Sequence, residues 1–205
     1  MNTQTRRSGT LKLVQIALLA ALVLVIQFFF ANARIGIIEM NFCLIPIVIA
    51  GIFVGPAAGF TVGAISGIAT FFQVLTIGGS FYTLLVNTNV VATAIICFLK
   101  ASLAGWLSGV TYNAFRRISG SSFFSSVVAS AVCPIVNTGI FCLGMLVFFS
   151  SALVASPEVG GGKDIFTIVF LVLAGTNFVV EFFSTVIITP ILSKALFATK
   201  VFRKK

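Results

Sequence analysis

Long apolar stretches separated by short turn-forming clusters dominate the chain. A helix that crosses a bilayer needs about 20 mostly apolar residues, and the apolar runs predict six such spans. Their approximate ranges are 11–30, 41–54, 57–77, 82–112, 123–154 and 165–192; the second is short, which predicts a tilted or broken helix, and the fourth and fifth are long enough to include turns outside the membrane. The breaks fall at turn residues such as Gly55-Pro56 and Ser119-Gly120. The pattern predicts an all-α integral membrane protein, folded as a single six-helix domain over residues 1–205.

Composition agrees with a membrane location and limits the reactions that the protein could catalyse. Of the 205 residues, 59% are hydrophobic and 8% are charged, and the mean hydropathy is +1.18, whereas soluble domains carry about 25% charged residues. The chain has no histidine and only four acidic residues, which argues against most acid–base and metal-dependent catalysis. The four cysteines, Cys43, Cys97, Cys133 and Cys142, lie in apolar runs without metal-ligand spacing. We therefore expect buried thiols, no metal, no cofactor and no enzymatic activity.

Basic residues predict the orientation of the spans, because cytoplasmic loops are enriched in lysine and arginine. If the N-terminus is cytoplasmic, six spans return the C-terminus to the same side. The cytoplasmic segments then hold Arg6, Arg7, Lys12, Arg116, Arg117, Lys194, Lys200, Arg203, Lys204 and Lys205. Only Arg34 and Lys163 lie in outer segments. The net charge of +9 is thus a topology signal for a bacterial plasma membrane. Nucleic-acid binding, which needs a solvated basic face, is not expected.

Small residues recur every four positions on three of the predicted helices. The ridges are Gly59–Gly63–Gly67, Ala101–Gly105–Gly109 and, on the first helix, Ala17–Ala21 with Ala20 adjacent. Such ridges let helix backbones approach closely in lipid. We interpret the two glycine-containing ridges as packing surfaces inside the bundle. The alanine notch on the first helix predicts either further packing or a docking site for another membrane protein.

Two charges are predicted to lie deep in the membrane, where each is costly. Lys100 lies about 27 Å along its helix from the outer start, and Glu181 about 24 Å along the last helix. The similar depth and opposite sign predict a buried ion pair. The pair either fixes helix register, or Lys100 meets an anionic ligand that Glu181 helps to orient; a proton relay is the third alternative.

Neutral polar residues form a second set at a similar level of the predicted helices. They are Gln73, Asn87, Asn89, Asn137 and Asn177. Interhelical hydrogen bonds explain many such residues, but Tyr82 and Arg34 in adjoining outer segments favour a polar pocket that opens outward. The chain has no glycine-rich phosphate loop followed by Lys and Ser or Thr, and no similar halves of inverted hydropathy. A binding pocket in a chain that has neither feature predicts that a partner protein supplies the energy for transport.

Several motifs resemble one family of membrane proteins. Besides the alanine notch, they are Ile45-Pro46, the segment Val54-Gly55-Pro56-Ala57-Ala58-Gly59, the run from Leu99 to Gly109, and Pro134-Ile135-Val136-Asn137-Thr138. Together they are similar to the substrate-binding (S) component of energy-coupling factor (ECF) vitamin transporters, and most of all to its pantothenate-type branch. Leu99-Lys100 stands where related sequences have Pro-Arg. A basic group is kept, but bidentate contact with a carboxylate is lost.

The resemblance implies a high-affinity vitamin site near the outer face and no catalysis. It also implies partners: a transmembrane coupling protein (T component), contacted through Ala17 and Ala21, and two cytoplasmic ATPases that drive reorientation of the S component. Pantothenate carries a carboxylate, hydroxyls and an amide, which suit a lysine with Asn and Thr groups. The open alternatives are an S component for folate, riboflavin or a pyrimidine precursor, and an unrelated small membrane enzyme or channel.

Overall fold

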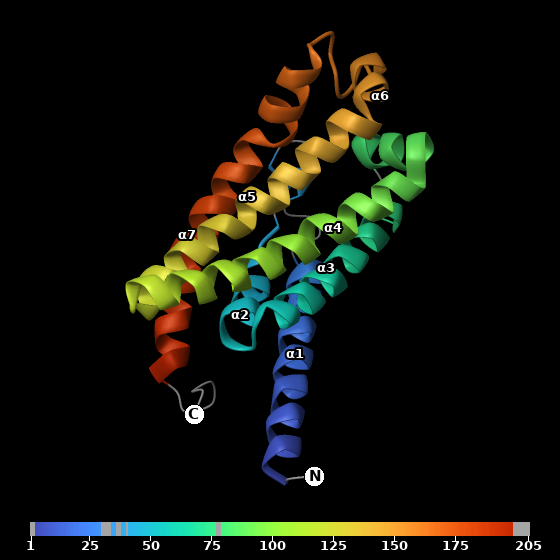
Figure 1. The fold of residues 1–205 in the computed structure, drawn as a ribbon. Coiled ribbons are helices and arrows are strands. Elements are labelled where there is room, and N and C mark those ends of the chain that lie inside the picture. The colour runs from blue at the N-terminus through green and yellow to red at the C-terminus, as the bar shows by residue number, and fades with distance from the viewer. Residues whose placement is uncertain (1–2, 30–33, 36–37, 40, 77–78, 199–205) are drawn as a thin grey trace.

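The structure, a computed structural model, describes residues 3–29, 34–35, 38–39, 41–76 and 79–198, with side chains over 9–29, 41–76, 79–175 and 177–198. These residues form a helical bundle with one short strand pair (Figure 1). The helices are α1 (Thr3–Phe29), α2 (Leu44–Phe53), α3 (Pro56–Thr76), α4 (Ser80–Ser119), α5 (Ser122–Phe148), α6 (Ser150–Ala155), the π-helix η1 (Thr167–Leu173) and α7 (Gly175–Ala198). Strands β1 (Arg34–Ile35) and β2 (Ile38–Glu39) pair antiparallel between α1 and α2.

Five helices are long and apolar enough to cross a bilayer. They contain Gly9–Phe29, Pro56–Thr76, Ser80–Ser119, Ser122–Phe148 and Asn177–Ala198. The second predicted span differs: α2 has 10 residues, or about 15 Å, half the thickness of a bilayer core of about 30 Å. All of α2 except Ile45 is buried. The described residues thus contain five bilayer-length helices and the short core helix α2, and six membrane spans stay a prediction.

Two other predicted spans are divided. The helical conformation of α4 is interrupted at Asn89 (φ −161°, ψ 93°), which separates a short first part from the long second part. Asn89 Oδ1 accepts a hydrogen bond from the N–H of Ala92 at 2.9 Å, so Asn89 caps the second part. The fifth predicted span is α5 followed, after Phe149, by the short α6. Hydropathy alone cannot locate these breaks, because apolar residues continue across them.

The glycine-containing ridges of α3 and α4 face each other. These two helices share the most extensive contact between any pair of elements. A Cβ atom added to Gly59 would overlap the backbone of Gly105, and one added to Gly63 would overlap the backbone of Ala101. Close backbone approach is how helices gain packing energy in lipid. The interpretation of both ridges as packing surfaces is confirmed.

Buried apolar side chains form two clusters. One surrounds α2 and includes Leu44, Ile47 and Val48; the other joins the start of α4 to α6 and η1. Figure 1 shows the beginning of α1 and the end of α7 toward the same end of the molecule. The cytoplasmic location of that end stays a prediction.

The π-helix η1 begins at a polar cap. The carboxylate of Asp164 accepts hydrogen bonds from Thr167 Oγ1–H at 2.7 Å and from the Thr167 N–H at 3.0 Å. These bonds stabilise the charged form and lower the pKa of the exposed Asp164 carboxyl. The cap fixes the start of the segment that leads to Leu173 and Ala174, both of which border a cavity described below.

We expect Gly63→Ala to lower the stability of the protein by about 1–3 kcal/mol, the usual range for overpacking a close contact. Gly139→Ala is the matched control, because a Cβ at this helical position meets nothing within 4 Å, and alanine is the better helix former by about 0.8–1 kcal/mol. Thermal unfolding in detergent measures both variants. Equal melting temperatures for the two would contradict the described contact between α3 and α4.

Candidate functional site

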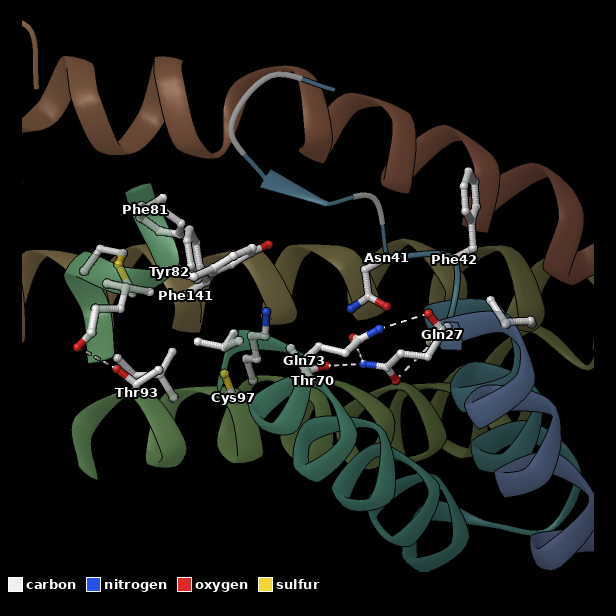
Figure 2. A pocket seen from close by; sticks show the side chains of 17 residues that line it. Gln27, Asn41, Phe42, Thr70, Gln73, Phe81, Tyr82, Thr93, Cys97 and Phe141 are labelled. Carbon is white, nitrogen blue, oxygen red and sulfur yellow. Dashed lines mark hydrogen bonds between the residues drawn. The ribbon is translucent and has the colours of Figure 1, made fainter. Parts of the chain in front are cut away.

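The larger of two adjoining cavities lies where the two apolar clusters meet. Its volume is about 70 Å³, and residues of α1, α3, α4 and α5 and of the segment before α2 line it. Figure 2 shows two unlike sides: Gln27, Thr70 and Gln73 on one, and Phe81, Tyr82 and Phe141 on the other. The ring centroids of Phe81 lie 5.6 Å from Tyr82 and 6.4 Å from Phe141. The cavity therefore offers both hydrogen-bonding and apolar surfaces.

Gln27 is the centre of the polar side. Its Nε2 donates to Thr70 Oγ1 and to Gln73 Oε1, both at 2.7 Å, and Gln73 Nε2 donates to the backbone oxygen of Gln27 at 2.9 Å. Three hydrogen bonds thus join the end of α1 to α3 at the cavity wall. The sequence analysis placed Gln73 in the pocket but missed Gln27. The sequence contains a signal for Gln27, because it is a polar residue within the apolar run of α1.

Lys100 stands between the two cavities and lines both of them, as do Asn41 and Phe141. Its Nζ lies 5.3 Å from the centroid of the Phe141 ring, a cation–π distance. No carboxylate oxygen among the described side chains lies within 4.0 Å of this nitrogen. The Lys100 cation, half-buried in a helix long enough to span the membrane, is thus positioned to bind an anionic group.

The smaller cavity, of about 50 Å³, brings together predicted site residues from α4, α5 and α7. Lys100, Asn137, Asn177 and Glu181 all line it. The last three are at most 6% exposed, and the Oδ1 atoms of Asn137 and Asn177 have no hydrogen-bond partner. Buried polar atoms almost always have a partner. These two acceptors are therefore unsatisfied in residues that border the smaller cavity.

The predicted ion pair between Lys100 and Glu181 is wrong as a direct contact. The two side chains border the same small cavity, but Glu181 Oε1 instead accepts a hydrogen bond from the Asn41 N–H at 3.0 Å. Glu181 thereby ties the segment before α2 to α7, and its side chain borders the same cavity as Lys100.

Two predicted binding residues are not brought to the cavities. Asn87 and Asn89 are exposed and line neither cavity, because α4 is broken at Asn89 and the amide of Asn89 is used as a helix cap. The side chain of Arg34 lies outside the described residues. Tyr82 and Gln73, in contrast, line the larger cavity, as expected.

Only part of the predicted docking notch lies on the outside of the bundle. Ala17 and Ala21 are exposed, whereas Ala20 is 8% exposed and packs inward beside Leu19 and Val23. Ala20 is therefore a packing residue, because successive helical positions point about 100° apart. The exposed face of α1 otherwise carries large apolar side chains, among them Leu18 and Leu22.

The arrangement can bind and orient a ligand. Lys100 supplies a positive charge, the side-chain oxygens of Asn137 and Asn177 accept hydrogen bonds, and the aromatic side accepts an apolar body. The four cysteines are buried free thiols, as expected, and the described residues contain no group of three His, Cys, Asp or Glu side chains able to hold a metal.

Comparison with protein families agrees with this geometry. The family model of the ECF transporter substrate-specific component matches residues 11–192. The chain belongs to this family. No curated protein and no solved structure matches it significantly. As an S component, it is a multi-pass membrane protein that binds a vitamin-type substrate and works with a T component and ATPases.

The Gln27–Gln73 contact of this S component can be tested by a double-mutant cycle. Gln27→Leu and Gln73→Leu are each expected to lower the unfolding free energy by about 0.6–2 kcal/mol, the range for interhelical hydrogen bonds in membranes. Because both side chains share one network, the double variant should lose clearly less than the sum. Thermal unfolding in detergent gives the values. Strictly additive losses would contradict a shared network.

Proposed function

We propose that this S component captures pantothenate, or a vitamin of the same acidic chemistry, in the joined cavities around Lys100. The observation that carries the proposal is the position of Lys100. It is a half-buried cation that lines both cavities and has no carboxylate within ion-pair distance among the described side chains. An ammonium group at this depth is costly unless an anion meets it. A ligand carboxylate supplies that anion.

The surroundings of Lys100 match the remaining groups of pantothenate. The unpartnered oxygens of Asn137 and Asn177 accept from its hydroxyl and amide donors, and Tyr82 and Met145 provide apolar contact for its methyl groups. Since one water needs about 10–15 Å³, the cavities take on the order of ten non-hydrogen atoms as they stand. Pantothenate is somewhat larger, so we expect the site to widen on binding.

Folate is the second candidate, because a specific feature favours it. It also carries carboxylates for Lys100, and the cluster of Phe81, Tyr82 and Phe141 offers surfaces for stacking a flat ring. Direct comparison of the affinities for the two vitamins separates these candidates. Pantothenate is preferred because the unpartnered amide oxygens suit a ligand with hydroxyl donors.

Delivery requires partners, because an ECF substrate-specific component works with a T component and ATPases. We propose that Ala17 and Ala21 dock on the T component and that the docked S component reorients to release the vitamin inside. The support is the exposure of both alanines on a helix that has few buried residues. Small residues at such a face let a partner helix approach closely.

Lys100→Gln is expected to weaken pantothenate binding about 10- to 100-fold, since a hydrogen bond to a charged group contributes about 1.5–3 kcal/mol and each 1.4 kcal/mol is tenfold in Kd. Isothermal titration calorimetry on the purified protein measures the change. Lys163→Gln, which removes an exposed lysine outside both cavities, is the matched control. The neutral alcohol analogue of pantothenate should bind both variants equally. An equal loss of affinity for this analogue in Lys100→Gln would show a structural role for Lys100 instead.

Ala17→Val together with Ala21→Val is expected to reduce vitamin uptake about tenfold or more, because branched side chains prevent close helix approach, and to leave ligand affinity unchanged. Uptake by cells that carry the complete transporter and calorimetry on the isolated S component give the two values. Leu18→Phe, at an exposed position of α1 about 100° around the helix from Ala17, is the control. Weaker ligand binding with normal uptake would contradict the docking role.

A further inference from the structure

A third cavity, of about 270 Å³, lies where α5 begins and α7 ends. Ser122, Phe123 and Ser126 of α5 and Lys194 and Phe197 of α7 line it. We call it the Lys194 cavity. It shares no lining residue with either cavity of the vitamin site, so binding of the vitamin does not account for it.

The Lys194 cavity lies at one edge of the membrane. The 27 residues of α5 extend about 40 Å, which is close to the thickness of a bilayer with its headgroups, about 40–45 Å. Ser122, the first residue of α5, therefore falls among the headgroups. Lys194 and Phe197 lie in the last two turns of α7, which ends at Ala198. The cavity is thus at the level where lipid phosphates are found.

This end of the bundle carries positive charge without nearby acidic residues in the chain. Lys194 is exposed, and so are Arg116 and Arg117, which lie in the last turn of α4, directly before the turn to α5. Glu181, the acidic residue nearest to Lys194 along α7, lies about 20 Å away along the helix axis. The next acidic residue after Arg117 is Glu158, beyond the opposite end of α5. A negatively charged partner complements this end of the bundle.

The lining of the Lys194 cavity favours a lipid over a small inorganic anion. Besides the lysine, it offers the hydroxyl groups of Ser122 and Ser126 and the rings of Phe123 and Phe197. The Phe197 ring stacks on Tyr112 of α4, with 6.5 Å between centroids and 19° between planes, which holds this wall in place. An inorganic anion has no apolar part to contact the rings. A phospholipid carries its phosphate directly beside a glycerol backbone and acyl chains.

The volume of the Lys194 cavity agrees with such a ligand. Since one water needs about 10–15 Å³, 270 Å³ has room for on the order of 20 non-hydrogen atoms. The headgroup and the glycerol backbone of a phospholipid are of this size. The acyl chains, in contrast, would extend along the apolar outside of the bundle.

We propose that the Lys194 cavity binds the headgroup of an anionic phospholipid. Lys194 pairs with the phosphate, Ser122 donates to it, and the two phenylalanine rings contact the glycerol backbone. Because both α5 and α7 contribute to the lining, the bound lipid holds the ends of these helices together and stabilises the S component. The lipid belongs to the leaflet at this end, which the basic residues predict to be the cytoplasmic one.

Thermal unfolding of the purified protein in a neutral detergent, with added phosphatidylglycerol, tests the proposal. We expect the melting temperature to rise with the lipid concentration and to saturate. Phosphatidylcholine, whose phosphate is neutralised by its own ammonium group, should raise it clearly less, and inorganic phosphate at the same concentration should leave it unchanged. Lys194→Gln should raise the half-saturating concentration of phosphatidylglycerol about fivefold, the factor for one basic residue near an anionic lipid surface.

Two further variants complete the test. Lys194→Arg keeps the charge and should keep the half-saturating concentration. Lys163→Gln removes an exposed lysine outside the Lys194 cavity and should also respond as wild type. An equal response to phosphatidylcholine, an equal response to inorganic phosphate, or equal half-saturating concentrations for Lys194→Gln and Lys163→Gln would each overturn the proposal. The test uses no vitamin, so its result is independent of the proposed function.

Discussion

The direct backbone contact between α3 and α4 is the constraint on which the site depends. Because Gly59 and Gly63 have no side chain, α3 lies against the backbone of α4 at Gly105 and Ala101. This contact fixes the position of α3 along the axis of α4. It thereby places Thr70 and Gln73 of α3 opposite Tyr82 and Lys100 of α4. Bulkier side chains between these helices would move the two sides of the larger cavity apart.

A second constraint is that polar groups in the membrane must find their hydrogen-bond partners within the protein, because lipid offers none. At the end of α1 the constraint is met: Gln27 and Gln73 satisfy each other and hold α1 against α3. Around Asn137 and Asn177 it is not met. The contrast separates polar residues that hold the bundle together from those that are unsatisfied beside the smaller cavity. Position in a membrane helix alone does not make this distinction.

Sequence reasoning predicted the helical membrane class, the packing of the glycine-containing ridges and the common location of Lys100, Asn137, Asn177 and Glu181. These features follow from residue spacing and helix geometry, which are local. It failed where tertiary structure decides. Asn89 is used as a cap at a break that continuous hydropathy conceals. Glu181 bonds to Asn41, a partner 140 positions earlier in the chain.

The central claim is that the Lys100 cation holds the acidic group of the vitamin. An experimental structure of the protein with bound pantothenate tests it most directly. We expect the ligand carboxylate at about 3 Å from Lys100 Nζ, the distance of a charge-assisted hydrogen bond, with donors of the ligand facing Asn137 and Asn177. A ligand bound elsewhere, or with its carboxylate turned away from Lys100, would show that Lys100 does not hold the acidic group.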